Sequence, residues 1–359
     1  MSANYCVIMA GGIGSRFWPM SRQNHPKQFI DILGTGETLL QATYRRIKSI
    51  FPPENVLVVT NEDYVQLVAE QLPQIPAENI LAEPMRKNTA PCIAYAAYKI
   101  KQKNPDATML ITPADHLVTK EEELIRVLNL GIDYATQNDV LLTMGIKPTR
   151  PDTGYGYIQF NPKDSGNTEI KKVKTFTEKP ELEMARHFMN SGEFLWNSGM
   201  FIWKLKTFID VFAKYMPEEY ALFNEAEPQF GTPDERKIIE DIYQEVHNVS
   251  IDIGIMEKAE NVYVIMADFG WSDLGTWGSL YDELREQQSN AVVGKNVMLY
   301  DSHNCMVHVP KDKLVVVQGL ENCIVAESNG VLLICKMEDE QKIKHLVNEV
   351  RIEKGEKFL

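Results

Sequence analysis

The residues best suited to chemistry lie in one glycine-rich segment near the N-terminus, residues 10–29. Its first part contains three glycines: Gly11, Gly12 and Gly14. Because a glycine has no Cβ, its backbone N–H group can approach an anion closely. Arg16 and Lys27 follow in the same segment, and their fixed positive charges suit phosphate oxygens. The segment therefore predicts a binding site for phosphate groups.

The net charge of the chain makes this concentration of cations informative. The 359 residues include 37 Lys and Arg against 50 Asp and Glu, which gives a formal charge of −13. The first acidic residue, Asp31, nevertheless comes after Arg16, Arg22 and Lys27. A chain this acidic is not expected to bind nucleic acid or an anionic membrane, so these cations indicate a small anionic ligand.

Two well-known phosphate motifs do not match this segment. The P-loop pattern G-x-x-x-x-G-K-[ST] does not occur, which argues against a Walker-type NTPase. The dinucleotide pattern G-x-G-x-x-G fails because Phe17 stands where its third glycine belongs, which disfavours a Rossmann oxidoreductase. A glycine-rich turn with solvated basic side chains remains the alternative interpretation.

Two acidic residues follow runs that are typical of strands. Asp115 comes after residues 108–112, and Asp273 comes after residues 262–267. Open α/β sheets bind their ligands beyond the carboxyl ends of such strands. Mg²⁺ usually binds one or two carboxylates together with substrate phosphates, so Asp115 could reach a metal in the same crevice as the glycine-rich segment. A helix cap for Asp115 and a turn for Asp273 are the alternatives.

Apolar runs and amphipathic stretches alternate through the first third of the chain. Strands are predicted at residues 5–9, 56–59, 108–112 and 140–144, and helices at residues 38–50, 62–72, 88–101 and 121–136. This alternation predicts right-handed βαβ units and a largely parallel sheet covered by helices on both faces. Further strands are expected at residues 155–160 and 170–177, and helices between residues 205 and 247 with breaks near Pro217 and Pro228.

The C-terminal part of the chain has a different pattern. Short Val, Ile and Leu runs recur from residue 291 to residue 335, separated by turn residues such as Asn329 and Gly330. This spacing predicts a small β module, closed by an amphipathic helix at residues 338–353. We therefore predict two domains, residues 1–285 and residues 286–359.

Cysteine usage and hydropathy indicate a cytoplasmic protein. The five cysteines are an odd number and include no C-x-x-C pair, so free buried thiols are expected rather than a disulfide framework or a zinc site. No apolar run approaches the roughly 18 residues of a membrane span. The N-terminus also lacks the features of a signal peptide.

The glycine-rich segment resembles one family in particular. Its pattern G-G-x-G-[ST]-R-x-x-P-[LM]-[ST], followed by P-K, is similar to that of the sugar-1-phosphate nucleotidylyltransferases. The Ser-Arg-Phe-Trp-Pro-Met-Ser-Arg and His-Pro-Lys-Gln-Phe forms resemble the mannose-1-phosphate guanylyltransferase branch. Further motifs of the family follow in its order at residues 86–91, 113–116, 154–157, 176–180, 196–199 and 271–275. The resemblance covers residues 5–280.

The resemblance implies a fold and a quaternary structure. The expected catalytic fold is that of nucleotide-diphospho-sugar transferases, a Rossmann-like, mostly parallel mixed sheet flanked by helices. In shorter members the C-terminal region resembles a short left-handed β-helix that forms subunit contacts, so a homodimer is expected. Longer members carry a further phosphomannose isomerase domain of the cupin type. The tail here has no histidine-rich metal pattern, so we expect a single activity.

The resemblance also implies roles for individual residues. Those expected to bind the nucleotide are Gly11, Gly12, Gly14, Ser15, Arg16, Lys27, Asn88 and Thr89. Those expected to bind the sugar phosphate are Gly156, Glu178, Lys179 and Asn197. Asp115 and Asp273 are expected to hold Mg²⁺, and the catalytic set comprises Arg16, Lys27, Asp115, Lys179 and Asp273. Without the resemblance, ordinary structural roles remain open, such as a helix cap for Asn88 and a turn for Asn197.

The implied reaction is nucleotidyl transfer. A phosphate oxygen of mannose 1-phosphate attacks the α-phosphorus of GTP in line, giving GDP-mannose and pyrophosphate. One alternative is a nucleotidylyltransferase that uses glucose 1-phosphate with UTP or dTTP. A second is a non-catalytic regulatory subunit that binds sugar nucleotides.

Overall fold

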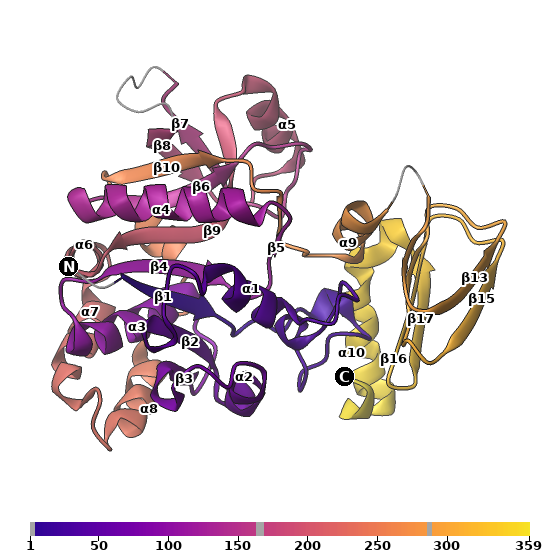
Figure 1. Ribbon diagram of the computed structural model, residues 1–359, viewed down its shortest axis with the longest axis horizontal. Helices are drawn as coiled ribbons and strands as arrows, with labels where there is room; N and C mark the ends of the chain where they lie inside the picture. Colours follow the sequence, from indigo (N-terminus) through magenta and orange to yellow (C-terminus); the bar gives the residue numbers. More distant parts are fainter. Residues whose placement is uncertain (1–3, 163–168, 286–288) are drawn as a thin grey trace. The chain divides into compact units, whose positions relative to one another are not determined.

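The structure of the chain, a computed structural model, describes residues 4–162, 169–285 and 289–359. It divides into two compact units that interleave along the chain (Figure 1). The first comprises Met1–Gly11, Arg45–Ala114 and Val118–Trp271, and the second comprises Gly12–Tyr44, Asp115–Leu117 and Ser272–Leu359. We predicted one boundary along the chain, at residue 285, whereas each of these units is built from three separate segments. The two predicted domains stay a prediction.

A nine-stranded mixed sheet lies at the centre of the first unit. Its strands are β1 (Asn4–Met9), β2 (Val56–Asn61), β3 (Ile80–Glu83), β4 (Thr108–Pro113), β6 (Leu141–Ile146), β7 (Tyr157–Phe160), β8 (Ile170–Thr177), β9 (Phe194–Lys204) and β10 (Val262–Ala267). Their spatial order is β3-β2-β1-β4-β9-β6-β10-β8-β7. Strands β8 and β9 run against the common direction of the others. The predicted mixed, mostly parallel sheet is confirmed.

Helices occur where the amphipathic stretches predicted them. They are α1 (Leu39–Ile47), α2 (Val65–Gln71), α3 (Thr89–Lys103), α4 (Glu121–Gln137), α5 (Leu182–Ser191), α6 (Leu205–Tyr215), α7 (Pro217–Glu225) and α8 (Glu235–Glu245). Pro217 begins α7 at a position where its missing N–H costs nothing. Pro228 lies in the 3-10 turn Glu227–Gln229, so both predicted breaks are confirmed.

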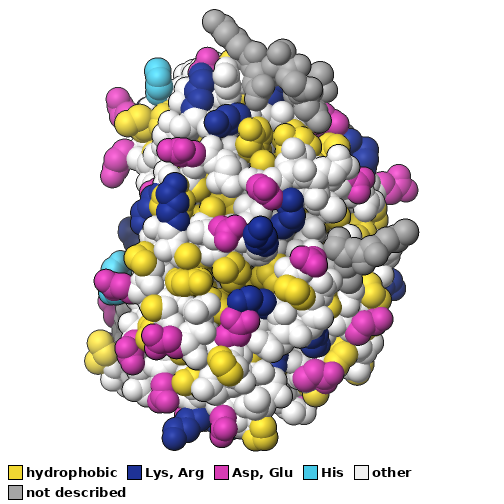
Figure 2. All heavy atoms as spheres, turned by 90° about the vertical axis from the view of Figure 1, so that its left-hand side faces the viewer, with side chains coloured by type: hydrophobic (Ala, Val, Ile, Leu, Met, Phe, Trp, Pro, Cys, Tyr) yellow, Lys and Arg dark blue, Asp and Glu magenta, His cyan; other side chains and the backbone are white. Residues whose placement is uncertain are grey.

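One face of the molecule carries mixed charge. On the face shown in Figure 2, lysines and arginines lie among aspartates and glutamates instead of forming one continuous basic area. Among the residues that the structure describes, no helix is long and apolar enough to span a membrane. The face in view therefore offers no extended basic surface for a polyanion.

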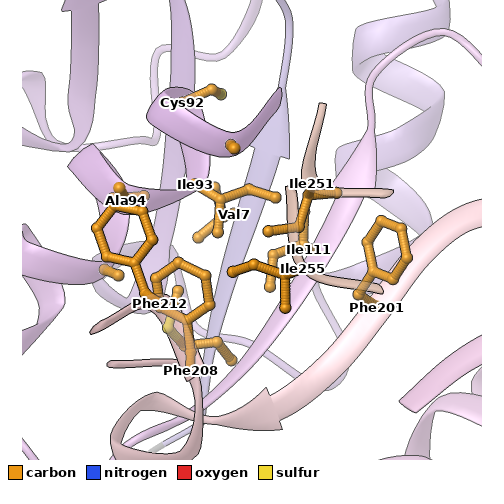
Figure 3. Close-up of a cluster of buried hydrophobic side chains, with 14 of the residues drawn as sticks. Val7, Cys92, Ile93, Ala94, Ile111, Phe201, Phe208, Phe212, Ile251 and Ile255 are labelled. Carbon is orange, nitrogen blue, oxygen red and sulfur yellow. The ribbon is translucent and has the colours of Figure 1, made fainter. Parts of the chain in front are cut away.

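The core of the first unit packs helices against both faces of the sheet. Figure 3 shows part of it, where α3, α6 and the strands meet through Val7, Ile93, Ile111, Phe208 and Phe212. Phe201 of β9 belongs to the same core, whereas its neighbour Ile202 faces α4. A Cβ added to Gly131 of α4 would lie 2.7 Å from Ile202 Cδ1, so a glycine allows this helix to pack closely. Because successive strand residues point to opposite faces, α3 and α4 cover opposite faces of the sheet.

The second unit contains the C-terminal β module. Its strands are β12 (Ala291–Val293), β13 (Asn296–Tyr300), β14 (Met306–His308), β15 (Leu314–Gln318), β16 (Cys323–Ser328) and β17 (Val331–Lys336). The chain alternates between two small sheets, with β12, β14 and β16 parallel in one and β13 and β15 parallel in the other. This alternation is the coil of a β-helix. The predicted C-terminal β module is confirmed.

Two helices accompany this module, α9 (Trp277–Leu284) and α10 (Ile343–Lys354). The terminal helix begins later than predicted because Met337–Lys342 forms a 3-10 helix instead. Phe17 and Trp18, from the glycine-rich segment, pack in the same apolar cluster as Trp277. The ring centroids of Phe17 and Trp277 lie 5.2 Å apart. The core of the second unit thus anchors the segment that carries Lys27.

Candidate active site

Lys27 is the centre of a compact polar group in the second unit. It begins the 3-10 turn Lys27–Phe29 and is only 4% exposed. Its Nζ lies 2.8 Å from Asp115 Oδ2 and donates to the backbone oxygens of Asp273, at 2.8 Å, and Leu274, at 3.2 Å. An ammonium has three donors, so each finds an acceptor. The structure therefore brings together Lys27, Asp115 and Asp273, which lie far apart in the sequence.

The glycine-rich segment holds Lys27 in this position. Gly14 has a φ of 65°, in the left-handed region that favours glycine. A Cβ added to Gly14 would lie 2.6 Å from Lys27 Cβ, so any other residue here would displace the lysine. Gln28 Nε2 donates to the backbone oxygen of Gly12 at 2.9 Å, and Ser21 Oγ donates to that of Ile13 at 2.6 Å. Gly14 thus has a packing role that the sequence pattern did not reveal.

Electrostatics keep Asp115 ionised. Burial raises the pKa of Asp115, but the charges of Lys27 and His116, with the hydrogen bond from Lys27, hold it below its ordinary value. The carboxylate remains 31% exposed. Asp115 therefore offers a charged oxygen both to Lys27 and to a ligand.

Asp115 and Asp273 are the residues that the resemblance assigns to Mg²⁺, and the structure brings both to the Lys27 ammonium. Both contact the Lys27 ammonium, the first through its carboxylate and the second through its backbone carbonyl. Within the described ranges, no group of three or more His, Cys, Asp or Glu residues could hold a metal. Mg²⁺ is commonly bound by one or two carboxylates and completed by substrate phosphates and water. The Asp273 carboxylate accepts a hydrogen bond from the Gly275 N–H at 3.0 Å, and a role of the two aspartates in holding Mg²⁺ stays a prediction.

Arg16 has different neighbours from Lys27. It lies in the 3-10 turn Ser15–Phe17, and its Nε is buried without a hydrogen-bond partner among the described residues. Its positive charge, followed by burial, lowers the pKa of Lys344. Arg16 also acts on the Glu340 carboxylate, where its charge opposes the rise in pKa that burial causes. Arg16 therefore has both a cation and a carboxylate nearby, and its role toward phosphate stays a prediction.

The predicted sugar-phosphate residues come together in the first unit. The backbone N–H of Asn197 donates to the Gly156 oxygen at 2.8 Å, and a Cβ added to Gly156 would lie 2.7 Å from Glu178 Oε2. Glu178 forms an ion pair with its neighbour Lys179, which is 61% exposed. Gly156 thus leaves the space that the Glu178 carboxylate occupies. We call these four residues the sugar cluster.

Asp252 adjoins this cluster and was missed from the sequence. It lies in the single π-helical turn Asp252–Met256, and its Oδ1 accepts a hydrogen bond from Asn197 Nδ2 at 2.9 Å. Thr143 Oγ1 donates to Asn197 Oδ1 at 3.0 Å, so the amide orientation is fixed from both ends. Burial, followed by the charge of Glu178, raises the pKa of Asp252 to about 7. An acid inside the apolar run Ile-Asp-Ile-Gly-Ile was the available signal.

The predicted base-binding residues have structural partners in the first unit. Asn88 caps α3, and its side chain accepts a hydrogen bond from the Thr89 backbone N–H. Thr89 Oγ1 accepts a hydrogen bond from the Ile251 N–H at 2.8 Å. Asn88 therefore has the capping role that the sequence left open, Thr89 instead holds the backbone at Ile251, and the contact of both residues with the base stays a prediction.

Glu83 is a second acid that the sequence did not single out. It is 5% exposed and accepts a hydrogen bond from Tyr243 Oη at 2.9 Å. Its Oε2 would lie 3.3 Å from a Cβ added to Gly11, the first glycine of the loop. Arg86 donates to the Gly11 oxygen at 3.4 Å. Glu83 thus places a carboxylate beside the start of the glycine-rich segment.

We expect Glu83 to make the protein less stable as pH rises. Burial raises its pKa from an ordinary value of 4.5 to about 7, although Tyr243 and Arg86 oppose the shift. Between these values the folded state binds more protons than the unfolded state, so stability falls with rising pH. Ionisation of the buried Glu83 lowers the free energy of unfolding by an amount on the order of 3 kcal/mol, and Glu83→Gln should remove this loss of stability. Urea unfolding at pH 5 and pH 8 measures the free energy of unfolding of both proteins. The variant should be more stable than the wild type chiefly at pH 8, and an equal increase in stability at both pH values would contradict this prediction.

Two family models match the chain. A nucleotidyl transferase model matches residues 5–290, and a model described as MannoseP isomerase/GMP-like beta-helix domain matches residues 294–350. The second match agrees with the alternating strands of the C-terminal module. Together the models extend over both the sheet-containing part of the chain and its β-helix.

Individual relatives agree with the family models. The mannose-1-phosphate guanylyltransferase of Klebsiella pneumoniae is 36% identical, over 95% of this chain and 72% of its own length. The alginate biosynthesis protein AlgA of Pseudomonas putida is 37% identical, over 95% of this chain and 70% of its own. A Thermus thermophilus structure described as mannose-1-phosphate geranyltransferase has a TM-score of 0.88 at 28% identity, covering 97% of this chain and 99% of its own. The chain therefore belongs to the nucleotidyl transferase family and is a nucleotidyltransferase, as its glycine-rich segment predicted.

Proposed function

We propose that the protein transfers GMP from GTP to α-D-mannose 1-phosphate, giving GDP-mannose and pyrophosphate. The names of the relatives support this choice of substrates. The observation that carries the chemistry is the buried Lys27 ammonium, in contact with Asp115 and Asp273. Such a group suits a reaction between two phosphorylated substrates.

The chemistry needs charge screening more than acid–base catalysis. The attacking phosphate oxygen is already anionic near neutral pH, so no general base is required. The obstacle is the repulsion between two anions, and fixed cations reduce it while positioning the reacting atoms. Opposite unit charges 4 Å apart attract by about 4 kcal/mol at an effective dielectric near 20. Lys27, Arg16 and Lys179 are proposed to supply this charge.

Asp115 and Asp273 are the proposed ligands of Mg²⁺. When bound, the ion would draw charge from the phosphate oxygens and favour departure of pyrophosphate. Lys27 has a separate role, because its ammonium holds the Asp115 carboxylate and the Asp273 backbone in place. We also propose that Gly11, Gly12, Gly14 and Ser15 present the loop backbone to the nucleotide.

Glu83 is proposed to select guanine. Guanine presents two adjacent donors, N1–H and the 2-amino group, and a carboxylate accepts hydrogen bonds from both. Glu83 Oε2 faces Gly11, while Tyr243 occupies the other oxygen. Asn88 and Thr89 are proposed to line the same base-binding region.

The sugar cluster is proposed to bind mannose 1-phosphate. The Glu178 carboxylate accepts hydrogen bonds from sugar hydroxyls, and Lys179 binds the phosphate. Asn197 uses its carbonyl oxygen for Thr143 and one N–H for Asp252, which leaves a second N–H as a donor to the sugar. Each of these side chains thus has a polar group suited to a hexose phosphate.

Pyrophosphate release from purified protein tests the proposal. GTP, UTP, dTTP and ATP are each supplied with mannose 1-phosphate or glucose 1-phosphate, in the presence of Mg²⁺. Rapid release is expected with GTP and mannose 1-phosphate only. Faster release with UTP or dTTP and glucose 1-phosphate would favour the alternative substrates, and no release with any pair would contradict catalysis. EDTA should abolish release if Mg²⁺ is required.

The β module is proposed to form a homodimer. Four apolar side chains of β13 and β15 are exposed: Met298, Tyr300, Leu314 and Val316. Met298 and Val316 are paired in register, so the exposed groups adjoin one another. Contiguous exposed apolar surface commonly marks a protein interface.

Val316→Glu is expected to separate the subunits, because it places a charge in this apolar surface. Light scattering should give twice the 40.9 kDa chain mass for the wild type and 40.9 kDa for the variant. Ile352→Glu is the control, since Ile352 is 84% exposed on α10. A monomeric wild type, or a dimer that survives the change, would contradict this proposal.

A cytoplasmic location is also proposed. All five cysteines are free, and four of them are buried. Free thiols persist in reducing compartments, whereas secreted proteins commonly pair them. Expression with a fluorescent tag and fractionation would test this location.

A further inference from the structure

The second unit contains a cavity that is lined by several cations. Lys27 is not among its lining residues. The cavity has a volume of about 260 Å³ and lies between the segment that follows Gly12 and helix α10. Arg22 lines the cavity from the segment that follows Gly12, and Lys344 and Arg351 line it from α10. No acidic side chain is found among the described residues that line it. In a chain with a formal charge of −13, this is a local excess of positive charge.

Neutral groups, not carboxylates, hold the two arginines. Arg22 donates to the backbone oxygens of Pro19, at 3.3 Å, and Ser328, at 2.8 Å. Arg351 donates to Asn348 Oδ1 at 3.5 Å, and its Nε is buried without a partner among the described residues. These contacts position the guanidinium groups without a carboxylate side chain, although Leu359, the last residue, also lines the cavity and brings its α-carboxylate to it. A buried donor without an acceptor is costly, so an anionic ligand would stabilise the site.

Lys344 lies within the field of a further cation. The charge of Arg16, followed by burial, lowers the pKa of Lys344. Arg16 and Lys344 repel one another and would together attract an anion, although Arg16 also acts on the Glu340 carboxylate, where it opposes the rise in pKa that burial causes. Arg16 thus adds to the positive potential of the cavity without being among its lining residues.

The rest of the lining is partly apolar, beside the polar residues Ser15, Ser21, Gln23 and Asn348. Trp18 is 6% exposed, and its Nε1 donates to the Phe358 oxygen at 2.8 Å, which fixes the ring. Ile13 and Val347 add aliphatic surface. An apolar wall beside cationic groups suits an organic anion, and the volume is small by the standard of ligand sites, which span about 300–1,000 Å³.

We propose that this cavity binds a small phosphorylated organic molecule, at a site separate from the Lys27 group. The phosphoryl group would lie against Lys344 and Arg351, and the organic part against Trp18. Ile13 and Ser15 also line the cavity, and both belong to the glycine-rich segment. A ligand here therefore contacts the segment that carries Lys27.

Calorimetric titration of the whole chain tests the proposal without requiring catalysis. Glucose 6-phosphate and inorganic phosphate are the probes, at constant ionic strength. The protein carries Lys27→Gln, so that binding at the Lys27 group is weakened. Saturable binding of glucose 6-phosphate is expected, with a Kd at least tenfold higher when Lys344→Gln and Arg351→Gln are added. Lys354→Gln, an exposed change on the same helix, should leave the Kd unchanged.

Three results would overturn the proposal. Glucose 6-phosphate binding that disappears with Lys27→Gln alone belongs to the Lys27 group. Binding that persists in the α10 double variant does not involve these cations. Inorganic phosphate that binds as tightly as glucose 6-phosphate would exclude recognition of an organic part. Melting curves of the two single α10 variants separate loss of binding from loss of folding.

Discussion

Replacing Lys27 with glutamine is expected to lower kcat about 10³-fold, the upper range for loss of one preorganised electrostatic group. The ammonium is 4% exposed and touches Asp115 and the Asp273 carbonyl, so a cation from solvent cannot take its place. Glutamine keeps a donor for Asp115 but removes the charge. Pyrophosphate release at saturating GTP and mannose 1-phosphate measures the effect.

The control for this variant is Lys48→Gln, which removes the same charge from an exposed position. It should keep wild-type kcat. The melting temperature of Lys27→Gln shows whether the fold survives, since Gly14 and Lys27 pack together. A folded Lys27→Gln enzyme with kcat within tenfold of wild type would contradict the role given to this ammonium.

Glu83→Gln is expected to lower kcat/KM for GTP by about 10³-fold, since a site built to bind polar groups discriminates strongly when one partner is wrong. A glutamine amide presents a donor where the guanine N1–H or 2-amino group needs an acceptor. ITP lacks the 2-amino group, so the wild type should prefer GTP to ITP. That preference should shrink in the variant.

Glu78→Gln is the control for nucleotide selection, because Glu78 is an exposed acid that precedes the same strand, β3. It should leave the GTP to ITP ratio unchanged. An unchanged ratio in Glu83→Gln would instead show that the carboxylate does not contact the base. The stability measurements described above distinguish loss of selection from a change in folding.

Much of the fold could be predicted because buried strands leave a clear sequence pattern. Strands β2 and β6 are buried along their whole length, so they appear as continuous apolar runs between helices. The glycine-rich segment was equally visible, since its glycines and cations are adjacent in sequence. Local patterns therefore sufficed for the elements and for the family.

The site was harder to predict, because its contacts join distant residues. Asp115 and Asp273 both reach Lys27, but nothing in their spacing indicates this, and only the family resemblance grouped them. Glu83 and Asp252 were missed for the same reason. Their partners Tyr243 and Asn197 lie 160 and 55 residues away along the chain. A single acid in an apolar run shows that something is unusual, but not what it binds.

Transfer of label from GTP tests the central claim most directly. GTP carrying a labelled α-phosphate is incubated with mannose 1-phosphate and Mg²⁺, and the products are separated by anion exchange. We expect label in GDP-mannose with the wild type and almost none with Lys27→Gln. Labelled GMP without labelled GDP-mannose, or label that stays in GDP while the sugar product is unlabelled, would show that the α-phosphorus is not transferred to the sugar phosphate.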